Sequence, residues 1–490
     1  MLFKYMYRTE KRCKLHPKEA DKKKFQAKNH IFERIQDASL FIRDNYGSPV
    51  RKHIRRENTT PTVVRDMVTQ KLSSQYYEKN NIVSVINTLK YMYYRHKKLI
   101  YVSIRQNHVK IFMQVINRGF RNPLANFMQL DYTTEKYINE NYREKKKLNP
   151  DFEPPNIKFN NPSTWAVQNC LIGNVMQLDM KRSDGYEVDY FFTEMQKFFE
   201  LVCRCRSIPD ADFFLNVHDQ IILHKHMIVP YKNIVGDRKI PITEYRGKKL
   251  TPILSFSSGD DYIDLPMVFP DDIQKLYKSY FIPKCSGKTD ITKFAMIWSE
   301  KKPTAVFRGS ATGCGFTVEN NPRLRLIYLA RKWATHDESM FDVALVGGDM
   351  VRFKKHASDK YVRYYIERRV KQEPENMMNL VDQSGYKYLL YLEGNVLAYR
   401  LSGMFSMGSV VIYVESEYKP WYYDLLVDRE NCVKCLKVDE LFKTITWCRD
   451  NDDKCEQIAK AGGKLYKEHF TKKGLLDYTA TLLRAINSKL

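Results

Sequence analysis

A turn between Thr304 and Ala330 carries the residue types of a phosphate site. A β-type run ends near Phe307, small residues follow it, and a helical pattern begins after Asn321-Pro322. The N–H groups at a helix start carry partial positive charge, and arginine binds phosphate through paired hydrogen bonds. The residues of this turn that we expect beside an anion are Arg308, Gly309, Ser310, Arg323 and Arg325. The competing interpretation is an ordinary strand-to-helix turn with solvated arginines.

A second turn of this kind follows the strand-like run YKYLLYLEG. Its N–H groups and its arginine are predicted to meet a diphosphate from the same side as Ser310 and Arg323. The candidate residues are Asn395, Val396, Leu397, Ala398, Tyr399 and Arg400. Two such turns in one half of the chain favour a nucleotide-diphosphate site more than either turn does alone. Glu415 and Glu417, an acidic pair after the run SVVIYV, are candidate contacts for a ribose or sugar hydroxyl, with surface solvation as the alternative.

A carboxylate lies at the end of another strand-like run, FLNVHD. In open α/β sheets ligands bind at the carboxyl ends of the strands, so Asp219 is placed for general-base chemistry. The alternative role for a loop aspartate is to form a turn or cap a helix. His218 is a candidate second polar contact, although a loop histidine is more often simply solvated.

Two other groups of residues resemble metal ligands only in part. Asp210 and Asp212 form a D-x-D pair, a spacing that can hold a divalent cation, but a structural role at the start of a strand is favoured. Four cysteines crowd near the C-terminal end, and only Cys432 and Cys435 have CxxC spacing. A structural zinc site needs two properly spaced pairs, so no metal is expected.

The elements that position these residues follow an alternating β–α order, which predicts an α/β fold with parallel sheets. Strands are expected at DFFLNVHD, PILSFSS, FDVALVGG, YKYLLYLEG and SVVIYV, in addition to the strand that ends at Phe307. Helices are expected over residues 188–205 and 271–281, after Asn321-Pro322, through YVRYYIERRV, from Val396, and at the end of the chain. The two blocks, about 165–295 and 296–470, suggest two lobes that face one another.

The chain before these blocks has a different character. Residues 1–30 are rich in lysine, helical periodicity runs from about Pro61 to Lys97, and LIYVSI and VKIFMQV form a predicted β-hairpin. A charged, proline-bearing stretch after residue 140 reads as a linker. We therefore predict an accessory region at 1–155, a lobe carrying Asp219 at 156–295, and a lobe carrying both candidate phosphate turns, with closing helices, at 296–490.

The composition favours a soluble protein with an anionic partner. The chain has 490 residues, 43% of them hydrophobic, with 81 Lys and Arg against 57 Asp and Glu and a net charge of +24. This charge favours phosphates or nucleic acid, the latter through the basic N-terminal region. The N-terminal residues lack a secretory signal and no apolar run suits a membrane span, so a cytoplasmic location is expected. The final Ser488-Lys489-Leu490 matches a peroxisomal address and is given low weight.

Together these pieces resemble glycosyltransferase family 90, the capsule-associated-protein group that includes the Rumi-type protein O-glucosyltransferases. The resemblance covers roughly residues 165–486. Its pieces occur in family order: Ile208-Pro209-Asp210 before FLNVHD, then PILSFSS, then WSEKKPTAVFRGSATG, then NPR, then YLEGNVLAYR, then MGSVVIYV. The hairpin and the form of WCRDNDDKC resemble the subgroup encoded by large nucleo-cytoplasmic DNA viruses, which would place the protein in host cytoplasm or virion.

The resemblance implies a GT-B-like fold with two Rossmann-type lobes and the active site between them. It implies inverting, metal-independent transfer of glucose or xylose from a UDP-sugar to a protein or glycan hydroxyl, with no cofactor. Asp219 matches the base, while Ser310, Arg323 and the segment from Asn395 to Arg400 match donor-binding positions. Arg323 is then the leading phosphate ligand, and Arg308 is assigned a structural role.

The sequence also departs from the family pattern. The usual arginine before the base is His218, the usual proline two residues after it is Ile221, and the tryptophan-rich acceptor loop is replaced by FPDDIQKLYKSYFIPKC. An insertion separates Ser310 from Arg323. These departures concern acceptor choice most directly. The alternative function is a basic nucleic-acid-binding or virion structural protein that kept the fold and lost catalysis.

Overall fold

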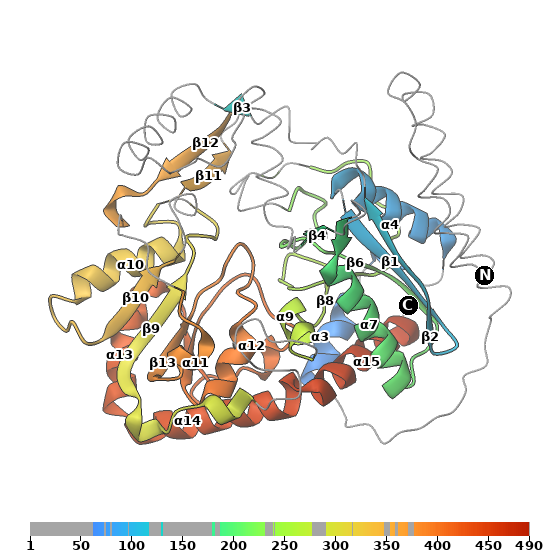
Figure 1. The fold of residues 1–490 in the computed structure, drawn as a ribbon. Helices are drawn as coiled ribbons and strands as arrows, with labels where there is room; N and C mark the ends of the chain where they lie inside the picture. Colours follow the sequence, from blue (N-terminus) through green and yellow to red (C-terminus); the bar gives the residue numbers. More distant parts are fainter. Residues whose placement is uncertain are drawn as a thin grey trace.

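Two five-stranded sheets organise the protein, each in its own α/β lobe (Figure 1). The computed structural model describes residues 62–72, 75–78, 81–96, 98–116, 129–130, 179–181, 187–230, 239, 241–276, 291–315, 317–346, 353–357, 361–370 and 377–489. The basic tail, the predicted linker and Leu490 lie outside the described residues. The predicted boundary at 155 lies outside the described residues as well, and the boundaries at 155 and 295 stay predictions.

The first sheet is mixed and has the order β2-β1-β6-β7-β8. The strands are β1 (Lys98–Arg105), β2 (His108–Ile116), β6 (Ala211–Leu215), β7 (Ile253–Ser255) and β8 (Leu265–Pro266). The predicted hairpin is present, and its turn residues Gln106 and Asn107 both have positive φ, at 50° and 60°, as a two-residue hairpin turn that matches the strand twist requires. Because β1 also pairs with β6, the hairpin is an integral part of the first lobe's sheet.

The second sheet is parallel throughout and has the order β10-β9-β13-β14-β15. The strands are β9 (Lys302–Gly309), β10 (Phe341–Leu345), β13 (Tyr386–Tyr391), β14 (Val410–Val414) and β15 (Val433–Cys435). Every residue of β14 is buried, as expected for a parallel strand covered by helices on both faces. The α/β class and the GT-B-like pair of lobes predicted from the sequence are confirmed. The prediction of parallel sheets holds for the second sheet, whereas the first sheet is mixed because it includes the antiparallel hairpin.

Helices cover both sheets, and short strands form two smaller sheets. The helices are α3 (Thr62–Leu72), α4 (Ile82–Arg95), α7 (Tyr190–Cys205), α9 (Pro270–Lys275), α10 (Pro322–Trp333), α11 (Leu380–Gln383), α12 (Leu401–Met404), α13 (Leu441–Asp450), α14 (Asp452–Leu465) and α15 (Lys472–Lys489). The smaller sheets contain β11 (Phe353–Ala357), β12 (Tyr361–Ile366) and β3 (Gln129–Leu130), and β4 (Asp179–Lys181) with β5 (Glu187–Asp189).

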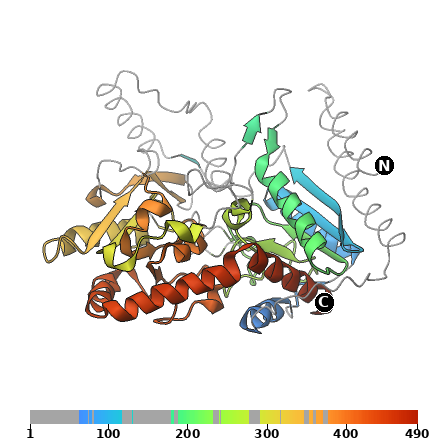
Figure 2. The same cartoon turned by 60° about the horizontal axis from the view of Figure 1, so that its bottom comes forward.

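The last helix returns to the first lobe. In Figure 2, α14 and α15 run from beneath the second sheet to beneath the first. The hydroxyl of Tyr478 donates to the carbonyl of Pro266 at 2.6 Å, and Arg484 Nη2 donates to the carbonyl of Ser207 at 2.7 Å. One apolar cluster accordingly contains residues of both lobes. Among the described residues, no helix is long and apolar enough to cross a membrane.

Two predicted helices are wrong. The segment YVRYYIERRV forms β12, paired with β11, before a short 3-10 turn over Arg368–Val370. Its β-branched and aromatic residues suit a strand, and pairing outweighed the helical spacing. The helix expected from Val396 begins only at Leu401 and has four residues. Val396 and Leu397 are instead buried in the apolar core, which holds the preceding segment as a loop.

Candidate active site

Asp219 stands at the contact between the two lobes, just beyond the carboxyl end of β6. The loop that carries it is fixed by Asn216, whose Nδ2 donates to the Ser255 hydroxyl at 3.0 Å and whose Oδ1 accepts from the N–H of His218 at 2.9 Å. Asp219 Oδ1 accepts from the Tyr399 hydroxyl at 2.9 Å, and its Oδ2 accepts from Asn395 Nδ2 at 3.2 Å. The carboxylate of one lobe is therefore held by two side chains of the other.

The surroundings of Asp219 suit a general base. Burial raises the pKa of its carboxyl group to about 6, while the bonds from Tyr399 and Asn395 and the charge of Arg323 act in the opposite direction. A carboxyl group with this pKa is ionised at neutral pH and is more basic than an ordinary aspartate. It can therefore accept a proton more readily in a reaction.

The helix start in the first predicted phosphate turn is occupied by the chain itself. Asn321 caps α10, and its Oδ1 accepts from the N–H groups of Arg323 at 3.1 Å and Leu324 at 3.0 Å. Its Nδ2 donates to three carbonyls of the preceding loop, those of Thr312, Cys314 and Gly315. The expectation that these two N–H groups face a phosphate is therefore wrong, because a capping side chain saturates them.

The Arg323 guanidinium organises the same turn from inside. Nε donates to the Glu393 carbonyl at 2.7 Å and Nη2 to the Leu392 carbonyl at 3.1 Å. Nη1 donates to the Ser310 carbonyl at 2.8 Å and to the Thr312 hydroxyl at 2.7 Å. Arg323 is 5% exposed, and burial lowers its pKa to about 10, so it stays charged at neutral pH. It joins the two predicted turns into one structure.

Gly309 and Ser310 lie in contact with this arginine. A Cβ atom on Gly309 would lie 2.7 Å from Cζ of Phe307 and 3.3 Å from Arg323 Nη1. A side chain at this position would therefore displace the ring on which the guanidinium rests, 5.6 Å from the ring centroid. Both residues contribute their backbone to the turn.

Arg400 has fewer internal bonds than Arg323. Its guanidinium, like that of Arg323, lies over the ring of Phe307, 5.5 Å from the ring centroid. Its Nη1 donates to the carbonyl of Arg308. Its Nε is buried and has no hydrogen-bond partner within the described residues. Burial, with a smaller effect of the nearby Arg323 charge, lowers its pKa to about 10. A buried charged donor without a partner is costly unless a ligand completes it.

The remaining candidates are placed at or away from these turns. Arg308 forms an ion pair with Asp342 of β10 at 2.6 Å, and Arg325 pairs with Asp439 on the outer side of α10. Ala398 donates its N–H to the Tyr391 hydroxyl at 3.3 Å. His218 is buried, with its ring 5.9 Å from that of His96.

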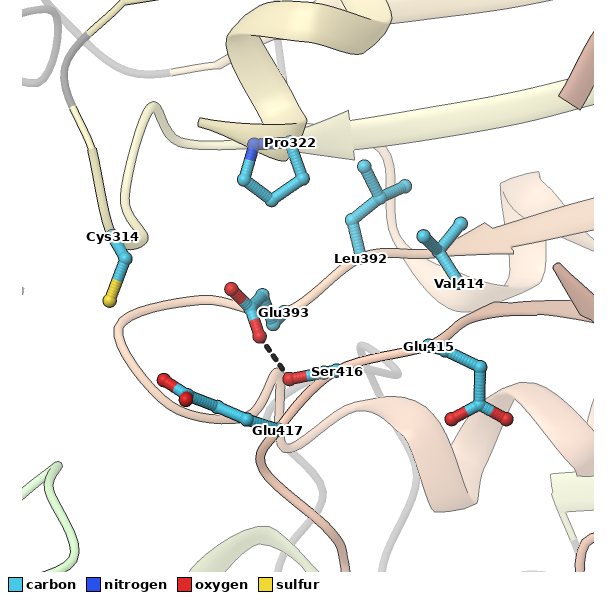
Figure 3. A pocket seen from close by; sticks show the side chains of 8 residues that line it. All are labelled: Cys314, Pro322, Leu392, Glu393, Val414, Glu415, Ser416 and Glu417. Carbon is cyan, nitrogen blue, oxygen red and sulfur yellow. Dashed lines mark hydrogen bonds between the residues drawn. The ribbon is translucent and has the colours of Figure 1, made fainter. Parts of the chain in front are cut away.

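A pocket of about 280 Å³ opens at the carboxyl ends of β13 and β14 (Figure 3). Cys314 and Pro322 of the first turn lie opposite the acidic residues Glu393 and Glu417. Glu393 accepts a hydrogen bond from the Ser416 hydroxyl. The full lining is Cys314, Pro322, Leu392, Glu393, Val414, Glu415, Ser416 and Glu417.

The sequence indicated Glu415 and Glu417 here but not Cys314 or Glu393. Glu415 accepts from the Tyr423 hydroxyl at 2.9 Å and lies 3.7 Å from Lys434 Nζ. Glu393 lies two residues after the end of β13, and this position at a strand end is the sequence signal that could have identified it. The pocket is therefore built by the ends of both turns together with the loop after β14.

The D-x-D pair has structural partners. Asp212 pairs with Arg105 at 2.6 Å and accepts from the Tyr101 hydroxyl at 2.9 Å. Asp210 Oδ1 accepts from the N–H of Gln106 in the hairpin turn at 2.8 Å. Among the described residues, no group of three His, Cys, Asp or Glu side chains could hold a metal ion.

Comparison with known proteins decides the family. The sequence model described as "Glycosyl transferase family 90" matches residues 190–490. The chain belongs to this family. The match contains Asp219, both turns and the pocket, so family 90 membership and the site just described concern the same part of the chain.

Relatives of this family 90 chain occur in viruses and in animals. The chain is 28% identical to "Uncharacterized protein 035R" of Invertebrate iridescent virus 3 over 98% of its own length and 44% of that protein. It is 26% identical to human "Protein O-glucosyltransferase 1" over 56% of the chain and 62% of the relative. The chain thus spans less than half the length of the viral relative and less than two thirds of the human one.

A solved structure is also similar over part of the chain. It is "Crystal structure of Anabaena Alr3699/HepE in complex with UDP and glucose", with 13% identity, 48% of this chain covered, 63% of that chain covered and a TM-score of 0.29. A TM-score this low does not bear on the fold, which rests on the two sheets described above.

Proposed function

We propose that the chain is an inverting, metal-independent glycosyltransferase that moves glucose or xylose from a UDP-sugar to a hydroxyl group of a protein or glycan. Family membership and the O-glucosyltransferase relatives support a sugar-transfer reaction. The observation that carries the mechanism is Asp219, a partly buried carboxylate of one lobe that accepts hydrogen bonds from Tyr399 and Asn395 of the other.

In the proposed reaction, the carboxylate of Asp219 takes the proton of the acceptor hydroxyl. The acceptor oxygen attacks the anomeric carbon from the face opposite UDP, a new carbon–oxygen bond forms, and the bond to UDP breaks. The leaving group carries the negative charge away as UDP. Positive groups fixed beside the diphosphate would stabilise this charge before it develops, the kind of preorganised help that can contribute several kcal/mol.

We expect the nucleoside and the diphosphate of the donor to bind in two neighbouring regions of the site. The pocket at the ends of β13 and β14 would take the nucleoside, because its carboxylates can accept hydrogen bonds from ribose hydroxyls. The diphosphate would lie towards Arg400, whose Nε is buried and has no partner in the described part of the chain. Arg323 would support this position chiefly by shaping the turn, because four of its hydrogen bonds go to the chain itself.

The test is Asp219→Asn, assayed by UDP release from UDP-glucose and by UDP binding. We expect UDP affinity to persist and turnover to fall by about 100-fold or more, the size of a general-base contribution. Asp210→Asn is the control. Its carboxylate holds the hairpin turn in the same lobe, so this variant should keep activity, and EDTA should leave wild-type turnover unchanged. Equal turnover of wild type and Asp219→Asn would remove Asp219 as the base.

The alternative of a nucleic-acid-binding protein rests on charge alone. The basic N-terminal tail lies outside the described residues, whereas the site combines a carboxylate of raised pKa with an arginine whose buried Nε has no partner in the described part of the chain. DNA binding that weakens steeply with salt, in a protein that binds no UDP, would favour that alternative.

A further inference from the structure

Two residues that the sequence assigned to donor binding, Tyr399 and Asn395, donate hydrogen bonds to the carboxylate of Asp219. We propose that Tyr399 and Asn395 are positioning residues that hold Asp219 oriented and ionised for proton abstraction. This proposal rests on the proposed role of Asp219 as the base. In this proposal, side chains of the second lobe control the orientation and the ionisation of a carboxylate of the first lobe.

Tyr399 is fixed by the lobe opposite its own. Its ring packs against Phe269 with 5.4 Å between centroids and against Phe256 with 6.0 Å. Both phenylalanines belong to the first lobe and are buried. The tyrosine ring therefore sits among first-lobe aromatic side chains, which direct its hydroxyl at Asp219 Oδ1, 2.9 Å away.

Asn395 couples the base to the first turn. Its Oδ1 accepts from the N–H of Gly313 at 3.4 Å, while its Nδ2 donates to Asp219 Oδ2 at 3.2 Å. An amide has one accepting and one donating end, so the backbone N–H on one side requires the NH₂ group to face the carboxylate. The Gly313 loop, the amide and the base thus form one chain of hydrogen bonds.

These two donors leave room for the acceptor. A carboxylate offers about four lone-pair directions, and only two are used by Tyr399 and Asn395. An acceptor hydroxyl can therefore bind Asp219 while both bonds persist. Both donors stabilise the ionised carboxylate and lower its pKa, against the effect of burial. The charge of Arg323 also acts on Asp219, and the groups that act on Tyr399 include Asp271 and Tyr391.

The test measures the titration of Asp219 without needing an acceptor. Protein labelled with ¹³C-aspartate is titrated by NMR, and the Asp219 signal is assigned by its absence in Asp219→Asn. Tyr399→Phe removes one donor and should raise the midpoint by about one pH unit, the size of a hydrogen bond to a charged group. Asn395→Leu should raise it by a smaller amount, because its bond is longer.

Tyr422→Phe is the matched control. The Tyr422 hydroxyl is buried and has no hydrogen-bond partner within the described residues, and its ring lies 5.8 Å from that of Phe269. Its removal should leave the Asp219 midpoint unchanged. The acidic limb of UDP-glucose turnover should move upward with the midpoint in Tyr399→Phe, so that the loss of rate is larger at pH 6 than at pH 8.

An unmoved midpoint in Tyr399→Phe would overturn the proposal, as would an equal shift in Tyr422→Phe. Failure of the proposed function gives a different result. If Asp219→Asn releases UDP as fast as wild type, Asp219 is not the base, whatever the titration shows. If Asp219→Asn is inactive and the Tyr399→Phe midpoint is unmoved, Asp219 remains the base and the positioning role is wrong.

Discussion

The two strand-to-helix turns of the second lobe share a sequence pattern but are stabilised in different ways. The turn from β9 to α10 is held from within, by the Asn321 cap and by the four hydrogen bonds of Arg323. The turn from β13 to α12 leads to a helix of four residues without a side-chain cap. Its residues Asn395 and Tyr399 bond instead to Asp219 of the other lobe.

The sequence pattern assigned the same role, phosphate binding, to both turns, whereas the structure gives them different contacts. The first turn is a rigid support whose polar groups are largely satisfied by the chain. The second turn keeps a buried donor at Arg400 and contacts Asp219, so under the proposed function it is the part that would meet the reacting groups. Three variants test this comparison.

Arg323→Met should give the largest effect, on stability. It removes a guanidinium that satisfies carbonyls in both turns, and we expect the free energy of unfolding to fall by about 3 kcal/mol. Chemical denaturation measures this change. A variant as stable as wild type would contradict the support role of the first turn.

Arg400→Met should act mainly on the donor. We expect UDP to bind roughly 30-fold more weakly, about 2 kcal/mol for a lost charged hydrogen bond, with little change in stability because few internal bonds are lost. Calorimetric titration with UDP, beside denaturation, separates the two quantities. Arg400→Lys, which keeps the charge but loses the planar fork, should recover part of the affinity. A large loss of stability with unchanged UDP affinity would reverse the comparison.

Asn321→Ser should give the smallest effect on stability, and it tests only the hydrogen bonds from the Asn321 amide to the loop carbonyls. Serine also caps a helix, so the loss is that of the Nδ2 bonds to the loop carbonyls, about 1 kcal/mol in the free energy of unfolding. Asn379 caps α11 through its Oδ1, and Asn379→Ser is the control, expected near zero. Equal effects of the two variants would show that the Asn321 amide does not hold the turn.

Much of this arrangement followed from the sequence. Alternating strands and helices predicted both lobes. Asp219 was selected as a candidate base because it follows a strand, and ligands bind at the carboxyl ends of strands in such sheets. The Asn321-Pro322 signal located the start of α10 correctly, but the same asparagine saturates the N–H groups assigned to phosphate. Satisfaction of a helix start by its own cap depends on side-chain geometry, which a motif does not specify.

Contacts between segments that are far apart in the chain could not be predicted from the sequence. Nothing in YLEGNVLAYR alone indicates that Tyr399 reaches a carboxylate 180 residues earlier. The YVRYYIERRV segment was misassigned because its spacing fits a helix, while its pairing with β11 depends on another strand. Burial of Val396 and Leu397, which delays the start of α12, likewise depends on the packed core.

The return of α15 to the first lobe has a consequence for the order of folding. The bond from Tyr478 to Pro266 joins residues 212 positions apart, and the bond from Arg484 to Ser207 joins residues 277 apart. During synthesis the first sheet leaves the ribosome long before the helix that packs beneath it. The lobe that is synthesised first can therefore be completed only after the end of the chain has been synthesised. If the chain were cut between the two lobes, neither fragment would contain both the first sheet and the helix α15 that packs against it.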